Sequence, residues 1–208
     1  MEGSAPQTGA RTTGRFGGFM TRQRPLIHAQ RGTRLVAAAG ALAVAGVLIS
    51  GCGSSGSSTP TTPAGIFQAG YSALSHGNYQ SAKAEFTAVL ATNPNMASAQ
   101  YNLGLAETGL RNNAAAVAAY QKAIQLDPKM TAAMFNLADL QATSDPKAAI
   151  ATLRQLLTIT PNDHNAQFNL GYLLYTHGHV AEGKVLLAKA IAADPALRSR
   201  LAPGMKVG

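Results

Sequence analysis

The chain has 208 residues, a formal net charge of +8 at pH 7 and a sequence pI of about 9.9. Its charge is uneven, because residues 1–51 hold six of the 17 basic residues and only one of the nine acidic residues. The residues that follow contain no cluster of Lys and Arg and no basic strip interleaved with aromatic side chains, which argues against nucleic-acid binding.

Residues 1–51 have the composition of an export signal. Six arginines come first, and an apolar and glycine run of 15 residues follows from Leu35 to Ile49, which is the order found in a secretory signal peptide. The run is shorter than the roughly 18 to 20 residues that a spanning helix needs, so a retained transmembrane helix is the less favoured alternative. Met20 lies nearer to the arginines and is an alternative translation start.

The apolar run ends in Ile49-Ser50-Gly51-Cys52, which resembles the bacterial lipobox. In that signal the cysteine thiol receives a lipid and the peptide is cut just before it. Cys52 is the only cysteine, and its Gly- and Ser-rich flanks offer no core in which it would be a small buried residue. The resemblance implies lipidation of Cys52 by two or three acyl chains, and therefore a stable anchor at the extracytoplasmic face of the cell membrane.

Residues 52–63 are expected to be the lipidated cysteine and a flexible linker. Residues 53–63 consist only of Gly, Ser, Thr and Pro, and this composition buries too little apolar surface to offset the entropy of the chain. The composition leaves open whether the linker is glycosylated.

From residue 64 the sequence repeats with a period of about 34 residues. Prolines recur at Pro94, Pro128, Pro161 and Pro195, and each ends an apolar run with helical spacing, because proline disfavours the α conformation in the residue before it. Two ladders of small residues are expected to let paired helices approach closely: Gly70, Gly104, Ala138 and Gly171, and Ala82, Ala116, Ala149 and Gly183. A bulky ladder is expected to fill the space between neighbouring pairs: Phe86, Tyr120, Leu153 and Leu187.

The segments Tyr101-Asn102-Leu103-Gly104, Phe135-Asn136-Leu137-Ala138 and Phe168-Asn169-Leu170-Gly171, with this period and these prolines, resemble tetratricopeptide (TPR) repeats. The resemblance implies an all-α TPR solenoid over residues 64–195, with repeats at 64–96, 97–130, 131–163 and 164–195 and a short C-terminal capping helix and tail at 196–208. Their first helices are expected at roughly 64–75, 97–109, 131–143 and 164–176. The third repeat is one residue short, and Pro146 is expected to open its second helix.

In TPR proteins the first helices line a concave groove, and the resemblance carries twelve positions of that groove over to this chain. They form an aromatic row (Phe67, Tyr101, Phe135, Phe168), an amide row (Gln68, Asn102, Asn136, Asn169) and a third row one turn further on (Tyr71, Leu105, Asp139, Tyr172). Amides both donate and accept hydrogen bonds, so a row of them suits the main chain of a bound peptide. The alternative is that the aromatic side chains pack between repeats and the amides bond neighbouring helix ends.

The predicted first helices contain no Lys or Arg, which argues against the mode in which TPR domains grip the C-terminal carboxylate of chaperones. The second helices carry charged residues that are expected to form a solvated convex surface: Lys83, Glu85, Lys122, Lys147, Arg154, Lys184 and Lys189. We therefore expect binding in the groove to depend little on charge.

The sequence contains no recognisable arrangement of catalytic residues and no cofactor motif. His177 and His179 share a turn without an evident third ligand, so no metal site is expected. We expect a non-enzymatic, lipid-anchored interaction module or assembly scaffold of the cell envelope that binds a protein or peptide partner. The alternative is a noncatalytic accessory subunit that recruits a cell-wall or lipid-processing enzyme.

Overall fold

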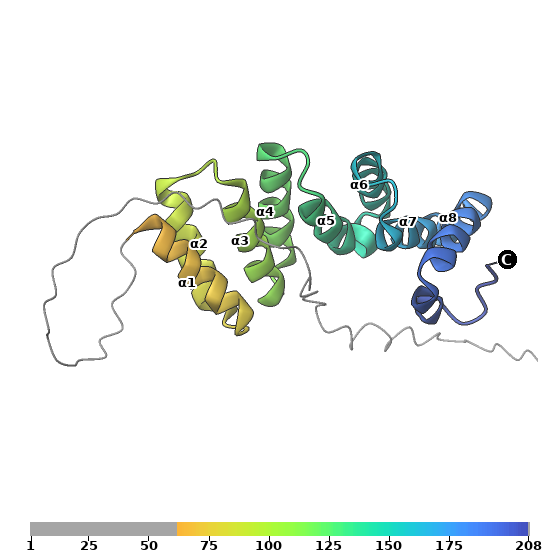
Figure 1. Ribbon diagram of the computed structural model, residues 1–208, viewed down its shortest axis with the longest axis horizontal. Coiled ribbons are helices and arrows are strands. Elements are labelled where there is room, and N and C mark those ends of the chain that lie inside the picture. Colours follow the sequence, from red (N-terminus) through yellow and green to blue (C-terminus); the bar gives the residue numbers. More distant parts are fainter. Residues whose placement is uncertain (1–61, 208) are drawn as a thin grey trace, which may run out of the picture. The chain divides into compact units, whose positions relative to one another are not determined.

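The computed structural model describes residues 62–207, which form eight α-helices and a terminal 3-10 helix (Figure 1). The helices are α1 (Pro63–Ser75), α2 (Tyr79–Thr92), α3 (Ala97–Gly109), α4 (Asn113–Leu126), α5 (Thr131–Ser144), α6 (Pro146–Ile159), α7 (His164–Thr176), α8 (Val180–Ala193) and η1 (Pro195–Arg200). The predicted signal segment, Cys52 and the linker up to residue 61 lie outside the described residues.

Consecutive helices pair into four helical hairpins, α1 with α2 through α7 with α8, and the second helix of each hairpin packs against the first helix of the next. This nearest-neighbour packing is the architecture of a solenoid, and it confirms the predicted all-α array of four repeats. The observed first helices match the expected ranges to within one residue at each end. In residues 62–207 no helix has the length and apolar character needed to cross a membrane.

The turns inside the hairpins follow two designs. In repeats one, two and four the chain passes through a left-handed residue, namely Gly77 (φ 74°), Arg111 (φ 62°) and Gly178 (φ 92°). In the third repeat Asp145 ends α5 and also caps α6, accepting a hydrogen bond from the Ala148 amide at 3.0 Å, and Pro146 is the first residue of α6 as expected. The one-residue deletion is thus accommodated by omitting the left-handed residue.

The two ladders of small residues mark where paired helices touch. A Cβ atom added to Gly183 of α8 would lie 2.7 Å from the carbonyl oxygen of Gly171 in α7, and one added to Gly104 would lie 2.5 Å from the ring of Tyr120. The bulky ladder is at most 1% exposed. Each hydrophobic cluster joins two neighbouring repeats or the last repeat and the C-terminal segment, so the core is distributed along the array.

One expectation about the second helices is wrong. Lys83 does not belong to a purely solvated surface, because its Nζ lies 2.9 Å from Oε1 of the buried Glu107 and joins α2 to α3. Arg154 and Glu182 form a second ion pair, between α6 and α8, at 2.9 Å. That pair is about half exposed on both sides, so it contributes little to stability.

The predicted C-terminal capping helix and tail contribute buried residues to the core. Leu197 of η1 is buried, and Val207 of the tail is buried in the same cluster as Phe168 of α7 and Leu187 of α8. The tail therefore closes the apolar end of the last repeat, which would otherwise be open to solvent.

Candidate functional site

The twelve predicted groove residues lie three to each first helix, on α1, α3, α5 and α7, and we call them the groove face. Neighbouring helices approach one another through this set. Tyr71 of α1 lies close enough to Tyr101 of α3 to affect its pKa, and Tyr101 accepts a long hydrogen bond of 3.4 Å from Asn136 of α5. The structure thus brings together residues from the first three repeats, one from each of the three rows.

The aromatic row serves mainly to pack the helices. Phe67 meets Phe86 edge to face with ring centroids 5.5 Å apart, and Tyr101 meets Tyr120 at 6.0 Å. Phe168 is only 3% exposed and stacks on Tyr172 at 6.5 Å. Aromatic pairs at these separations stabilise the fold beyond their buried area. All three pairs lie within one repeat, so these contacts are packing inside the hairpins, whereas the alternative placed the aromatic side chains between repeats. The large exposed aromatic of the face is Tyr71, which is 55% exposed.

The four amides of the amide row differ in solvent exposure and in hydrogen bonding from one repeat to the next. Gln68 in the first repeat is exposed, whereas Asn102 in the second is only 7% exposed. Asn136 is half-buried and donates to Tyr101, and Asn169 accepts a hydrogen bond from Arg200. The alternative interpretation therefore fits two of the amides, because Asn136 and Asn169 form hydrogen bonds with neighbouring elements, while Gln68 is exposed to solvent.

The tyrosines of the second repeat are held neutral by their surroundings. Burial raises the pKa of Tyr101, an effect that the hydrogen bond from Asn136 opposes and that the neighbouring Tyr71 reinforces. Burial also raises the pKa of Tyr120, whose Oη lies 3.1 Å from Oγ1 of Thr108. Tyr101 thus remains a neutral hydroxyl group, able to donate as well as accept a hydrogen bond.

Sequence reasoning missed one residue of this face, Arg200 at the end of η1. Its guanidinium lies over the ring of Phe168, 4.7 Å from the centroid, and donates from Nη1 to Asn165 at 3.0 Å and from Nη2 to Asn169 at 2.9 Å. The signal was present in the period, because Arg200 lies 34 residues after Ala166, where the first helix of a fifth repeat would run. A basic residue from η1 therefore borders the groove face, although the four helices that carry this face contain none.

Asp139 and Arg200 influence each other across this face. Desolvation lowers the pKa of Arg200, and the charges of Asp139 and Asp194 oppose that shift. Desolvation by the neighbouring helices raises the pKa of Asp139, even though its side chain has an exposed edge, and the charge of Arg200 acts in the opposite direction. The C-terminal part of the face thus holds one acid and one base that are close but not in ion-pair contact.

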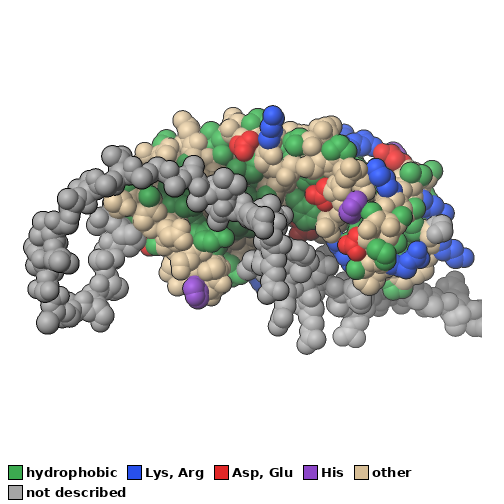
Figure 2. Space-filling view, viewed as in Figure 1, with side chains coloured by type: hydrophobic (Ala, Val, Ile, Leu, Met, Phe, Trp, Pro, Cys, Tyr) green, Lys and Arg blue, Asp and Glu red, His purple; other side chains and the backbone are tan. Residues whose placement is uncertain are grey.

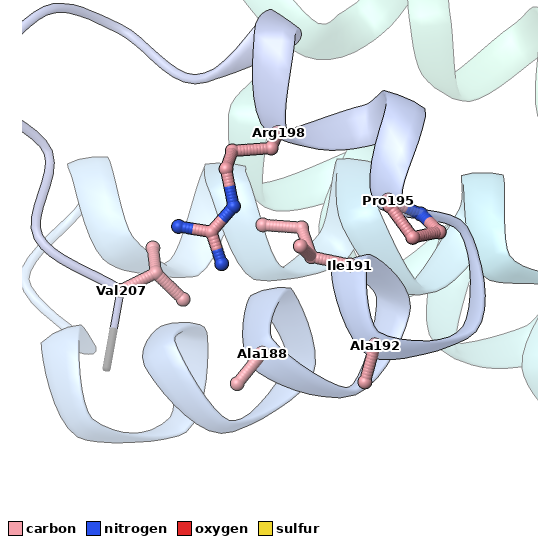
Figure 3. Close-up of a pocket in the computed structure, with 6 residues that line it drawn as sticks. All are labelled: Ala188, Ile191, Ala192, Pro195, Arg198 and Val207. Carbon is pink, nitrogen blue, oxygen red and sulfur yellow. The ribbon is translucent and has the colours of Figure 1, made fainter.

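A separate hollow lies at the C-terminal end of the array, formed by α8, η1 and the tail (Figure 3). Its lining residues are Ala188, Ile191, Ala192, Pro195, Arg198 and Val207. In Figure 3 the Arg198 side chain extends toward the space between Val207 and Ile191. The lining is otherwise apolar and small, so this hollow carries no chemistry beyond packing.

His177 and His179 lie in the turn between α7 and α8. Nδ1 of His177 lies 2.8 Å from the carbonyl oxygen of Leu173, which occupies one ring nitrogen, and His179 precedes α8. Across residues 62–207 no group of three potential metal-ligating side chains comes together.

A model of the tetratricopeptide repeat family matches residues 67–131, 109–164 and 139–198, which together span more than half of the chain. The chain therefore belongs to the tetratricopeptide repeat family. The matched family is not a catalytic one, and its fold is that of a protein–protein interaction module. No curated protein is similar enough in sequence to count as a match.

Several solved structures have a similar fold. The crystal structure of MamA matches with a TM-score of 0.62 and 20% identity, over 68% of this chain and 83% of that one. YrrB, described as a TPR protein with an unusual peptide-binding site, matches with a TM-score of 0.60 and 20% identity, over 64% of this chain and 70% of that one. An O-GlcNAc transferase mutant from Thermobaculum terrenum matches with a TM-score of 0.56 and 21% identity, over 64% of this chain but only 26% of the transferase. At these levels of sequence identity, the similarity shows a shared fold and nothing more specific.

Proposed function

We propose that the chain is a lipid-anchored, non-enzymatic TPR module of the cell envelope whose groove face holds a peptide segment of a partner protein. The observation that carries this proposal is the row of polar groups left on the first helices after the repeats have packed. Gln68 and Tyr71 are exposed on α1, Tyr101 of α3 lies near Tyr71, and Asn136 of α5 donates a hydrogen bond to Tyr101.

The chemistry of this row suits a peptide backbone. An extended or helical segment presents amide and carbonyl groups at regular intervals, and neutral amide side chains pair with either kind. Tyr71 adds a large apolar surface with a hydroxyl at its tip, a combination that is enriched where proteins bind one another. The peptide-binding site described for YrrB shows that this fold accommodates such a ligand in at least one protein.

The lipid anchor is the second part of the proposal and rests on the lipobox at Ile49-Ser50-Gly51-Cys52. An anchor at Cys52 followed by a short flexible linker would hold the repeats close to the outer face of the membrane, where they would serve as an assembly scaffold. Replacing Cys52→Ala should leave an unlipidated, unprocessed precursor in membrane fractions. Intact-mass analysis that finds the mature membrane form unlipidated, or starting elsewhere, contradicts this part.

The groove is tested by selecting ligands from a randomised twelve-residue peptide library against the full-length chain. The triple variant Gln68→Ala, Asn102→Ala, Asn136→Ala removes three amides and leaves Asn169 in place. Each neutral hydrogen bond is worth roughly 0.5 to 1.5 kcal/mol, so the selected peptides should bind at least tenfold more weakly.

The matched control replaces three exposed glutamines of the second helices, Gln80, Gln121 and Gln155, with alanine. This change removes the same chemistry from the other face, so binding should stay within about twofold of the parent. Equal losses in both variants, or a larger loss in the control, would show that the groove face is not the working surface.

A further inference from the structure

The outward side of α8 is left uncovered by the rest of residues 62–207. The inward side of the helix is buried against α7 and the C-terminal segment, and its residues are Gly183, Leu187, Ala190 and Ile191. The outward residues follow one another at intervals of three and four, so they share one helix face, and all of them are exposed. We call this set the α8 outer face: Ala181, Lys184, Val185, Ala188, Lys189 and Ala192.

This face combines exposed apolar side chains with lysines. Among residues 62–207 three large hydrophobic side chains are exposed, and two of them belong to α8, namely Val185 at 68% and Val180 at 40%. Lys184 lies between them in the sequence, and Lys189 lies one turn after Val185. Lysines beside apolar residues bury their stems and hold their ammonium groups in water or among headgroups. The combination is typical of helices that lie at a lipid–water interface.

The positive charge of the α8 outer face has no counterpart in the part of the chain that the structure describes. No carboxylate lies at ion-pair distance from Lys184 or Lys189. Arg198 of η1 adds a third positive charge, because it borders the same hollow as Ala188 and Ala192 (Figure 3). In Figure 2 Lys and Arg side chains are concentrated at the C-terminal end of the array, with hydrophobic side chains among them.

The acids near this face act on other bases. Glu182 in the first turn of α8 forms an ion pair with Arg154 of α6, and the two charges cancel. Asp194, which follows α8, acts together with Asp139 on Arg200, which lies on the groove side. Arg200 is therefore left out of the balance. The α8 outer face and Arg198 keep three positive charges, which attract an anionic surface.

We propose that the α8 outer face rests on an anionic phospholipid surface. The inference rests on the lipid anchor of the proposed function and adds a second contact with the same membrane. Headgroups would supply the negative charge, and the level just below them would take the exposed valines. A flexible linker of about ten residues after Cys52 reaches roughly 15 to 20 Å, so the anchor would keep the array near the bilayer, where even a weak contact forms.

The proposed contact would orient the array. The inward side of α8 packs on α7, which carries the last residues of the groove face, so a bilayer at the α8 outer face lies beyond α8 from the groove. The groove face would then remain open to a partner in the aqueous phase.

The chain contains no Trp, so a single introduced Trp reports on one position. Val185→Trp places this reporter on the α8 outer face, and Tyr71→Trp places it at an exposed position of the groove face. The full-length chain is isolated from membranes and reconstituted into vesicles of phosphatidylcholine, or of an equal mixture of phosphatidylcholine and phosphatidylglycerol. Quenching of the Trp fluorescence by lipids with brominated acyl chains then measures contact with the bilayer.

We expect quenching of the reporter at position 185 in the anionic vesicles and not in the neutral ones, and no quenching of the reporter at position 71 in either. Adding Lys184→Gln and Lys189→Gln should lower the ratio of contacting to free α8 about fivefold for each lysine. Raising the salt from 0.05 to 0.5 M should release α8, because screening shortens the reach of the charges. The chain itself should stay anchored.

The matched control replaces two exposed lysines of the second repeat, Lys122→Gln and Lys129→Gln. These lysines lie two repeats away from α8, so their removal should change the ratio by less than about twofold. An equal or larger effect of this control would overturn the inference, because the contact would then depend on net charge and not on the α8 outer face. Thermal unfolding shows whether each variant is folded at the temperature of the measurement.

Equal quenching at position 185 in neutral and anionic vesicles, or quenching that survives the loss of both lysines, would overturn the inference, since the tether alone would then bring α8 to the bilayer. A reporter that is shielded from an aqueous quencher and not reached by brominated lipid would also overturn it, because another protein copy would then cover α8. Co-sedimentation with neutral vesicles, without quenching in anionic ones, would remove this inference and keep the anchor. Failure to co-sediment with neutral vesicles would overturn both.

Discussion

The ammonium group of Lys83 lies 2.9 Å from a carboxylate oxygen of Glu107, and this contact ties the second helix of repeat one to the first helix of repeat two. Glu107 is only 5% exposed and also accepts a hydrogen bond from Asn112 at 2.8 Å. Burial by itself raises the pKa of Glu107, but the hydrogen bonds from Lys83 and Asn112 and the charge of Lys83 outweigh it, so the net pKa is lowered. The carboxylate is therefore charged in the folded array, and Lys83 and Asn112 stabilise that charge.

The first prediction concerns removal of one partner. Lys83→Met should lower the free energy of unfolding by roughly 1 to 3 kcal/mol, because it leaves a buried carboxylate with only Asn112 as its partner. Urea unfolding followed by circular dichroism measures the change. Lys189→Met, at an exposed position of α8, should change stability by less than about 0.5 kcal/mol. Equal effects of the two substitutions would mean that the ion pair does not stabilise the interface between repeats.

The second prediction concerns pH. The folded-state pKa of Glu107 lies below its ordinary value of 4.5, so the stabilisation is fully present above pH 4.5 and is lost as pH falls through the lower folded-state pKa. The difference in stability between the parent chain and Lys83→Met should therefore shrink between pH 7 and pH 3. A difference that stays constant over this range would contradict the assigned ionisation.

The third prediction uses the contact between α7 and α8. Gly183→Ala places a methyl group 2.6 Å from the backbone nitrogen of Tyr175 and 2.7 Å from the carbonyl oxygen of Gly171. Backbone atoms cannot move aside as the end of a side chain does, so overpacking should cost about 1 to 3 kcal/mol. Helix propensity alone favours alanine over glycine by up to about 1 kcal/mol. We therefore expect Gly183→Ala to lower the free energy of unfolding, which urea unfolding measures. A stabilised variant would show that α7 and α8 do not approach so closely.

The fourth prediction concerns the left-handed turn of repeat two. Arg111 has φ 62° at the position that Gly77 and Gly178 hold in repeats one and four. A left-handed conformation costs an L-residue about 1 to 2 kcal/mol, and part of the relief on changing to glycine is offset by the greater entropy of the unfolded chain. Arg111→Gly should therefore raise the free energy of unfolding by up to about 1 kcal/mol, and Gly77→Ala should lower it. A destabilised Arg111→Gly variant would mean that the Arg111 side chain contributes more than its backbone costs.

The repeat architecture was predictable from the sequence because a solenoid depends on local features. A proline every 33 or 34 residues ends each hairpin, and small residues at fixed offsets mark where paired helices meet. These signals located the first helices to within a residue. Gly77, Arg111 and Gly178 occupy equivalent positions in this period, and the structure shows that all three are left-handed.

The details of the groove face were less predictable, since they depend on how side chains of different repeats meet. Nothing in the sequence indicates that Lys83 pairs with Glu107 in the next repeat, or that Asn136 bonds Tyr101. Arg200 was missed because it follows the last complete repeat, and its position over Phe168 depends on how η1 packs on α7 and α8. The first helices contain no Lys or Arg, as expected, and Arg200 reaches Asn165 and Asn169 of α7 from η1, outside those helices.

The central claim is that the first helices form the working surface, and site-specific photo-crosslinking tests it most directly. A photoreactive amino acid is placed at Gln68, which is exposed on α1, or at Val185, which is 68% exposed on α8, in the full-length chain in the cells that produce it. We predict one dominant adduct from position 68, lost when Asn102 and Asn136 are also replaced by alanine, and no specific adduct from position 185. An adduct that forms from position 185 and not from position 68 would contradict the account.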